Sequence, residues 1–166
     1  MQIVSEKNIN MQELDFTEDD DTLKDKFLTF KISNEIYALE IGFVIEIIGM
    51  QSITKIPNIK GFINGIINLR GIIIPVIEVR TRFGMPKIPY TDRTCIVVVN
   101  INESSIGLIV DEVSEVLMIP SENISAPPAT GKGTQSKFIK GVGSIEDDIK
   151  ILLDIKTLLY DEIIYN

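Results

Sequence analysis

The chain has 166 residues, of which 45% are hydrophobic and 24% charged, an ordinary balance for a folded globular protein. Its formal net charge is −8 and it has no basic stripe, so binding to nucleic acid or to an anionic membrane surface is not expected. The sequence has no histidine and one cysteine, which excludes Ser/His/Asp and Cys/His catalytic arrangements, the usual zinc sites and an internal disulfide. We therefore expect no enzyme, no cofactor and no metal site.

The amino terminus differs from the rest of the chain. Residues 1–26 hold eight acidic residues against three lysines and show no sustained apolar period, so residues 1–25 are predicted to be a flexible acidic tail. The chain does not open with a basic segment followed by an apolar one, and no apolar run approaches 18 residues. This pattern predicts a cytoplasmic protein with no direct membrane insertion.

The folded part begins with a predicted hairpin. From residue 27, FLTFKI alternates large apolar residues with others, SNE forms a turn, and IYALEI resumes the alternation. Residues 43–49 are predicted to be mostly strand, although so short an apolar run also fits a helical turn. After a breaker at 55–58, residues 59–63 are predicted to form a short helical turn.

The next segment, NGIINLRGIIIPVIEVRTRFG, spans residues 64–84 and places an arginine in an aliphatic run. Residues 65–69 and 72–79 are predicted strands, interrupted by an Arg-Gly pair. Pro75 has no N–H, so we expect it on a sheet edge or beside a bulge. Arg70 cannot lose its proton, and it must either find a carboxylate or reach the surface to contact something else.

The second half of the chain continues the same kind of pattern after a loop at residues 83–93. Short strands are predicted at 94–101, 106–110, 115–119, 138–145 and 150–154, with a long exposed loop at 120–137. Residues 155–164 have helical spacing and predict a short amphipathic helix. About ten short strands and one helix predict an all-β protein, and ten strands suit two small barrels. No convincing repeat at a fixed period is visible in the sequence.

Two features have competing interpretations. Cys95 lies within TCIVVV, where a buried strand cysteine acting as a small hydrophobe is favoured over a nucleophile. Gly61 and Gly65 either permit tight turns and close backbone approach or leave a flat surface in which a partner's side chain lodges.

At the run NGIINLRGIIIPVIEVRTRFG the chain resembles the CheW family, the coupling proteins of bacterial chemotaxis. FLTFKISNEIYALEI resembles the opening hairpin of that family, and IGLIVDEVSEVLMIP and FIKGVGSIEDDIKILLDIKTLL resemble its later segments. The resemblance runs from about residue 27 to residue 159. The chain departs from the family pattern at Asn64, where a basic residue is common, and at Glu78, where Asp is more common.

The resemblance implies two SH3-like five-stranded β-barrel subdomains packed together, with a short C-terminal helix. The CheW-like domain is expected over 26–165, with discontinuous subdomains of approximately 29–75 plus 140–160, and 76–139. Family members are adaptors that link methyl-accepting chemoreceptors, through the receptors' cytoplasmic tips, to the regulatory domain of the histidine kinase CheA within receptor arrays. A place at the inner face of the membrane, and self-association in array rings, belong to the same expectation.

Carried over by position, the resemblance implies receptor or kinase coupling by Val44, Glu46, Gly65, Arg70 and Val116, and we add Ile47 and Asn64 to the predicted binding set. The aliphatic members would line a groove between the subdomains for an amphipathic receptor helix. Glu46 is the candidate partner of Arg70, and such a pair is compatible with both a structural and a docking role.

Two alternatives stay open at this point. A CheV-like or CheA-derived regulatory domain would share the fold, and the length of the full gene would separate these cases. A small-molecule-binding barrel would need a deep enclosed pocket with convergent ionisable groups.

Overall fold

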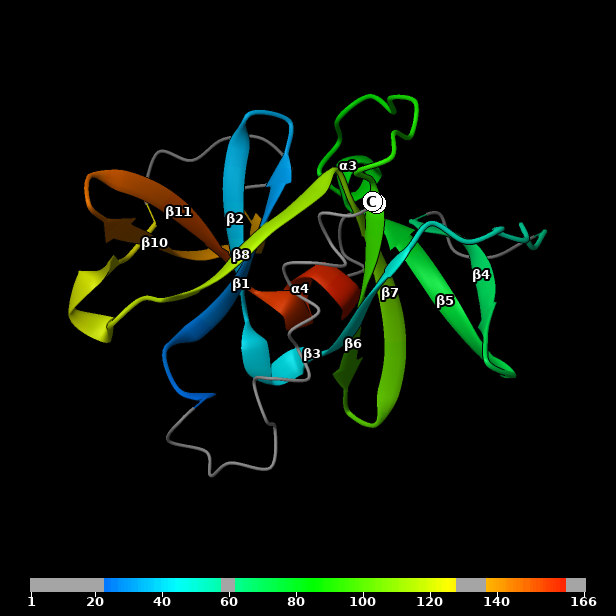
Figure 1. Ribbon diagram of the computed structural model, residues 1–166, viewed down its shortest axis with the longest axis horizontal. Helices are drawn as coiled ribbons and strands as arrows, with labels where there is room; N and C mark the ends of the chain where they lie inside the picture. Colours follow the sequence, from blue (N-terminus) through cyan, green and yellow to red (C-terminus); the bar gives the residue numbers. More distant parts are fainter. Residues whose placement is uncertain (1–22, 58–61, 128–136, 161–166) are drawn as a thin grey trace.

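The structure is a computed structural model, which describes residues 23–57, 62–127 and 137–160. Figure 1 shows two β-barrels side by side with one short helix, α4, between them. The architecture is mostly β, as the sequence predicts, with sheets of six and five strands. Among the described residues, no helix is both long and apolar enough to cross a membrane.

We call the six-stranded sheet barrel A and the five-stranded sheet barrel B. Barrel A has the order β8-β1-β2-β11-β10-β9, and its strands are β1 (Lys26–Ile32), β2 (Glu35–Glu40), β8 (Glu112–Met118), β9 (Ile124–Ser125), β10 (Ile139–Ile145) and β11 (Asp148–Leu153). Barrel B has the order β3-β6-β7-β5-β4, and its strands are β3 (Val44–Gly49), β4 (Ile63–Leu69), β5 (Ile72–Glu78), β6 (Cys95–Ile101) and β7 (Ser104–Val110). The short helical elements are η2 (Ile41–Phe43), α3 (Val79–Arg82), η3 (Ser121–Asn123) and α4 (Ile155–Tyr160).

Most predicted strands are confirmed within one to three residues at each end, including the opening hairpin and the strands on either side of Arg70. One prediction is wrong in part: the strand expected to run through Val79 ends at Glu78, and the chain turns into α3. The predicted loop at 120–137 contains η3 and β9. The acidic tail, the helical turn at 59–63 and the end of the predicted helix lie wholly or mainly outside the described residues.

Pro75 lies where the sequence places it. In the register of β5, pairing with β7 begins only at Val76, so Pro75 is bounded by a partner strand on the β4 side alone. The β4–β5 register also shifts between Ile63 and Gly65, which face Ile77 and Val76. A residue without an N–H therefore sits at a local edge and close to a bulge.

Tight turns join three of the hairpins and have two central residues at positive φ. These pairs are Arg70 and Gly71 (52° and 88°), Asn102 and Glu103 (54° and 66°), and Glu146 and Asp147 (48° and 71°). Two-residue turns of this hand match the right-handed twist of the strands that they join. The turns therefore fix which residues face each other across each hairpin.

Barrel B closes because the chain after β3 crosses to the opposite edge of the sheet. Thr54 forms an antiparallel bridge with Ile66 in β4, and both backbone hydrogen bonds, between the nitrogen of each residue and the oxygen of the other, are 2.9 Å long. The crossing is possible because Gly65 has no side chain: a Cβ atom there would lie 2.5 Å from the Thr54 oxygen and 2.6 Å from Ile53 Cγ2. Of the two interpretations of Gly65, close backbone approach is the one that fits.

Barrel A closes in the same way. The chain after β8 crosses to β10, where β9 pairs with Val142 and Gly143. A Cβ atom at Gly141 would lie 3.2 Å from the Ser125 oxygen, and one at Gly143 would lie 3.0 Å from Ile119 Cγ2. Each barrel thus uses a glycine beneath the strand that closes it.

The two halves of the chain repeat one succession of elements, a relationship that the sequence did not reveal. Hairpin, strand, hairpin and helix follow one another in β1–β5 with α3 and again in β6–β11 with α4. The opening hairpin of each half joins the barrel built mainly by the other half. The sheets therefore divide the chain differently from the expected 29–75 plus 140–160 and 76–139, because β3, β4 and β5 pair with β6 and β7.

Register irregularities mark equivalent positions in the two halves. One residue is inserted at Ile45 in β3 and at Ser114 in β8, and another at Asn64 in β4 and at Lys140 in β10. Asn64 lies six positions before Arg70, the first residue of one tight turn, and Lys140 lies six positions before Glu146, the first residue of another. By the offset from 45 to 114, Ile47 is equivalent to Val116.

The described residues form three apolar clusters. Ile67, Val76 and Val98 lie in the interior of barrel B, and Phe27 and Leu152 in the interior of barrel A. The largest cluster joins the barrels and includes Ile155, Leu158 and Leu159 of α4. It also contains a chain of four aromatic rings, formed by Phe30, Tyr37, Phe83 and Phe138. The centroids of successive rings in this chain are 6.1, 5.2 and 5.9 Å apart. The barrels are therefore parts of one folding unit.

We predict that Gly65→Ala lowers the free energy of unfolding by about 1–3 kcal/mol, because the new Cβ must displace the backbone that closes barrel B. The measurement is urea unfolding followed by circular dichroism. Gly49→Ala is the matched control, since a Cβ there meets nothing within 4 Å, and we expect a change within about 0.5 kcal/mol. Equal effects at the two glycines would show that the crossing does not constrain Gly65.

Candidate docking site

The predicted partnership between Arg70 and Glu46 is present. Arg70 Nη2 donates a hydrogen bond to Glu46 Oε2 in an ion pair. Glu46 lies on β3 and Arg70 in the β4–β5 turn, so the pair joins the two edge strands of the sheet of barrel B. The two residues come together because the barrel closes at Thr54, eight positions after Glu46.

The ion pair lies mostly in solvent. The exposed fraction of the Arg70 side chain is 68% and that of Glu46 is 27%. Ion pairs at such exposure contribute roughly 0–1 kcal/mol, since water already solvates both charges well. The pair therefore positions the guanidinium far more than it stabilises the fold, and most of the arginine surface is available to a partner.

Arg70 also has a backbone conformation that arginine rarely adopts. Its φ is 52°, and the following Gly71 has a φ of 88°. The turn is supported by Asn68, whose Oδ1 accepts a hydrogen bond from the Gly71 nitrogen at 2.8 Å. Asn or Gly is easier to accommodate than Arg at the first position of such a turn. An arginine held there against the local preference is typical of a functional position.

Exposed apolar residues follow Arg70. Ile72 and Ile73, the first residues of β5, have exposed fractions of 62% and 56%. Ile45, the inserted residue of β3 beside Glu46, has an exposed fraction of 42%. A charged group flanked by solvent-exposed isoleucines is a common composition for a protein-binding surface.

The aliphatic residues of the candidate set lie where the barrels meet. Val44 is buried, and Ile47 and Val116 are partly buried against the apolar cluster that joins the barrels. We call these three residues the inter-barrel seam. Ile47 and Val116 occupy equivalent positions on β3 and β8, which are edge strands of their sheets. These residues, which are far apart in the sequence, thus all belong to or pack against one apolar cluster.

Asn64 and Gly65 lie on β4, where Gly65 is buried beneath Ile53 and Thr54. Asn64 is the inserted residue of β4, and it lies close enough to Tyr90 to influence the ionisation of that hydroxyl. Burial, and after it the nearby Glu78 carboxylate, raise the pKa of the Tyr90 hydroxyl. Both residues of β4 are therefore engaged by their own chain, and any role in docking is through the strand that they support.

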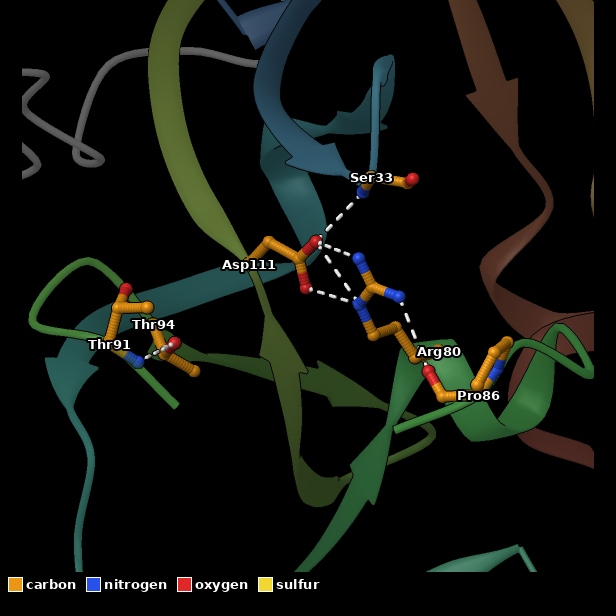
Figure 2. A network of polar contacts seen from close by, with 6 residues as sticks. All are labelled: Ser33, Arg80, Pro86, Thr91, Thr94 and Asp111. Atoms are coloured by element: carbon orange, nitrogen blue, oxygen red, sulfur yellow. Dashed lines mark hydrogen bonds and ion pairs between the residues drawn. The ribbon is translucent and has the colours of Figure 1, made fainter. Parts of the chain in front are cut away.

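Two buried arginines that we did not single out from the sequence make polar links between the barrels. Figure 2 shows the first: Arg80 Nε donates to Asp111 Oδ1 at 2.9 Å and Nη2 donates to Oδ2 at 2.8 Å. The hydrogen bonds to Asp111 raise the pKa of Arg80 above its usual value. Asp111 Oδ2 also accepts a hydrogen bond from the Ser33 nitrogen at 2.7 Å. The link therefore connects α3 of barrel B with the β1–β2 turn of barrel A.

The second arginine, Arg82, is buried. Its Nε donates to the Leu158 oxygen at 2.6 Å, at the end of α4 where carbonyl groups lack helical partners. Its guanidinium carbon lies 4.0 Å from the ring centroid of Phe62 and 4.9 Å from that of Phe138. The PVIEVRTR sequence contains both arginines, but their partners are 31 and 76 residues away and could not be identified from local pattern.

Two cavities bounded by described residues lie apart from the candidate set. One of about 620 Å³ is bounded by residues 23–27, Glu40, Phe43, Lys140 and their neighbours. Another of about 410 Å³ lies beside Asp111 and residues 91–94. Neither of these two cavities is lined by the inter-barrel seam or by Arg70.

The arrangement is therefore that of a double-barrel protein with a candidate docking surface exposed on the β4–β5 hairpin. A CheW-like domain model matches residues 26–162. The chain is 35% identical over 142 residues to the chemotaxis protein CheW of Klebsiella aerogenes, covering 86% of each sequence. It is 31% identical to the chemotaxis protein CheW of Bacillus subtilis, covering 83% of this chain and 88% of that protein.

A solved structure agrees with these relatives. The crystal structure of the scaffolding protein TtCheW from Thermoanaerobacter tengcongensis superposes with a TM-score of 0.74 at 39% identity. The superposition covers 81% of this chain and 91% of that protein. The chain belongs to the CheW-like domain family, as its sequence signatures predict.

We predict that Arg70→Ala and Glu46→Ala each change the free energy of unfolding by less than about 1 kcal/mol, because the pair is exposed. A double-mutant cycle in urea isolates the coupling between the two side chains, which we expect to be equally small. A loss of about 3–5 kcal/mol for either variant would contradict this expectation, since a loss of that size is typical of breaking a buried pair.

We predict that Cys95 is unreactive in the folded protein. The residue is buried in β6, and burial raises the pKa of its thiol to about 12, so at pH 8 only about one thiol in ten thousand is ionised. A thiol reagent should modify Cys95 at the rate of unfolding, whereas an introduced cysteine at exposed Asn100 should react at once. Rapid modification of native Cys95 would support the nucleophile interpretation instead.

Proposed function

We propose that this protein is a chemotaxis coupling adaptor that binds a CheA-type histidine kinase and the cytoplasmic tip of a methyl-accepting receptor at the same time. The observation that carries the proposal is the CheW-like family match, which runs through both barrels. The protein would transmit the state of the receptor by biasing the conformation of the kinase, with no chemistry of its own. It would act in the cytoplasm, at the inner face of the membrane, through receptor arrays.

The inter-barrel seam is the proposed receptor surface. A receptor tip is helical, and an amphipathic helix binds through apolar residues on one face. Ile47 and Val116 are partly buried and lie at equivalent positions of two edge strands, so they offer apolar contacts from both barrels to a single helix. Val44 lies deeper and supports the floor of the seam.

The β4–β5 hairpin is the proposed kinase surface. Ile72 and Ile73 offer apolar area to the regulatory domain of the kinase, and Arg70 offers a guanidinium that Glu46 holds in place. Asn64 and Gly65 contribute by holding β4 in its closed position. If the protein also assembles into array rings, the same hairpin is available for that contact.

We predict that Arg70→Ala keeps its fold and lowers receptor control of kinase activity roughly tenfold, which corresponds to about 1.4 kcal/mol of lost coupling. Kinase activity is measured with purified receptor fragment, kinase and adaptor. Arg93→Ala is the matched control, because Arg93 is also exposed (58%) and also faces a carboxylate, that of Glu112 at 3.7 Å. We expect this control to behave as the unchanged protein.

Separate pull-downs with kinase and with receptor fragment test the two surfaces. The proposal fails if the unchanged protein binds neither partner, or binds both and leaves kinase activity independent of receptor. An Arg70→Ala protein that is folded and fully active in coupling would remove Arg70 from the docking surface. Equal losses in the Arg70 and Arg93 variants would indicate a general effect of charge.

A further inference from the structure

The chain passes between the barrels at two equivalent points. It leaves barrel A through η2, whose middle residue is Gly42, and it returns from barrel B through the single residue between β7 and β8, Asp111. The offset from 45 to 114 that relates the two halves also relates 42 to 111. The two crossings thus lie at equivalent positions of the repeat, one occupied by Gly42 and the other by Asp111.

The two crossings differ in how they are held. A Cβ atom at Gly42 would meet nothing within 4 Å, so no side-chain contact restrains this crossing at Gly42. At the other crossing, the Asp111 nitrogen donates to the Lys31 oxygen at 3.2 Å. The Asp111 carboxylate accepts hydrogen bonds from the Ser33 nitrogen and from the guanidinium of Arg80. The first crossing is held by apolar burial, since Ile41 is fully buried in the cluster that joins the barrels, whereas the second is held by directional hydrogen bonds.

The fixing interaction is directional. Arg80 presents two nitrogens to two oxygens of Asp111, an arrangement that holds angle as well as distance. The exposed fractions of the two side chains are 10% and 21%, so water competes with the pair far less than it does at Arg70. Arg80 is itself held by the Pro86 oxygen, which accepts from Nη1 at 3.3 Å. Figure 2 shows the carboxylate between the β1–β2 turn and α3.

Each crossing leads directly into a strand of the inter-barrel seam. Gly42 is followed two residues later by Val44 and, in the same strand, by Ile47, while Asp111 begins the approach to Val116. The apolar cluster pulls the barrels together, but apolar contact is not directional and tolerates small rotations. The placement of β3 relative to β8 thus depends on the crossing at Asp111, which is held by directional hydrogen bonds.

We infer that Arg80 and Asp111 are positioning residues that set the angle between the barrels and so give the inter-barrel seam the spacing that a receptor helix requires. The inference rests on the proposed function only for the identity of the helix. The link acts as a clamp on one crossing, while the other crossing is held by the burial of Ile41 and Val44. Neither Arg80 nor Asp111 has to contact the receptor. Loss of either side chain would weaken receptor binding by changing the angle between the barrels.

The angle is tested first, without any partner. Spin labels on introduced cysteines at Asp148 of barrel A and Asn100 of barrel B, both exposed, report the distance between the barrels, and buried Cys95 does not compete for the label. We expect Arg80→Lys and Asp111→Asn to shift or broaden the distance distribution. Lysine keeps the charge of Arg80 but cannot reproduce its two parallel hydrogen bonds, so this variant should remain folded.

Lys140→Ala is the matched control for the angle. It removes an ion pair of similar length, from Lys140 Nζ to Glu40 Oε1 at 2.6 Å, but both residues lie within barrel A. We expect this variant to keep the distance distribution of the unchanged protein. An unchanged distribution in both Arg80→Lys and Asp111→Asn would overturn the clamp, whatever the receptor does.

Receptor binding is tested second, with a purified receptor-tip fragment. We expect Arg80→Lys and Asp111→Asn to weaken receptor binding about tenfold, within the range usual for coupling between sites, while kinase binding through the β4–β5 hairpin stays within twofold. A changed angle with unchanged receptor affinity would overturn the inference and leave the proposed function intact. If the unchanged protein does not bind the receptor fragment, the proposed function fails, and the label distances still decide whether the clamp exists.

Discussion

Closure of the two small sheets is the constraint on which the rest of the molecule depends. A sheet of five or six short strands leaves two open edges unless they meet, and here a crossing segment joins them in each barrel. The crossing needs backbone-to-backbone approach, which Gly65 allows at Thr54 and Gly141 allows at Ser125. Once barrel B is closed, Glu46 on one edge and Arg70 at the other are neighbours. The exposed ion pair is therefore a consequence of closure rather than its cause.

Apolar burial and polar links have separate tasks between the barrels. The cluster built around α4 and the aromatic chain removes a large apolar area from water and holds the barrels together. Arg82 stacks on Phe62 and Phe138 and binds the end of α4, so it adds orientation to that burial. Burial supplies most of the attraction, and the hydrogen bonds of the arginines add angular restraint, because their strength depends on angle.

Local sequence pattern predicted the strands and the turns, because alternation and turn residues are local signals, and it showed that the charge of Arg70 needs a partner or the surface. Glu46 was named as that partner only through the family resemblance. Local pattern did not reveal the repeat. Equivalent residues such as Ile45 and Ser114, or Asn64 and Lys140, share backbone geometry and no side-chain chemistry. The spacing between the two insertions also differs, from 45 to 64 in one half and from 114 to 140 in the other. Nor can periodicity show that an opening hairpin joins the opposite barrel, since that pairing is entirely long-range.

The repeat explains how one fold can present unlike surfaces. Equivalent positions are apolar in both barrels where they contribute to the inter-barrel seam, as at Ile47 and Val116. They diverge at the hairpin tips, where Arg70 of one half corresponds to Glu146 of the other. A partner that offers a carboxylate to the first tip meets like charge at the second, so the two ends of the molecule cannot exchange partners. Equivalent backbone positions thus carry opposite charges at the two tips and similar apolar side chains at the seam.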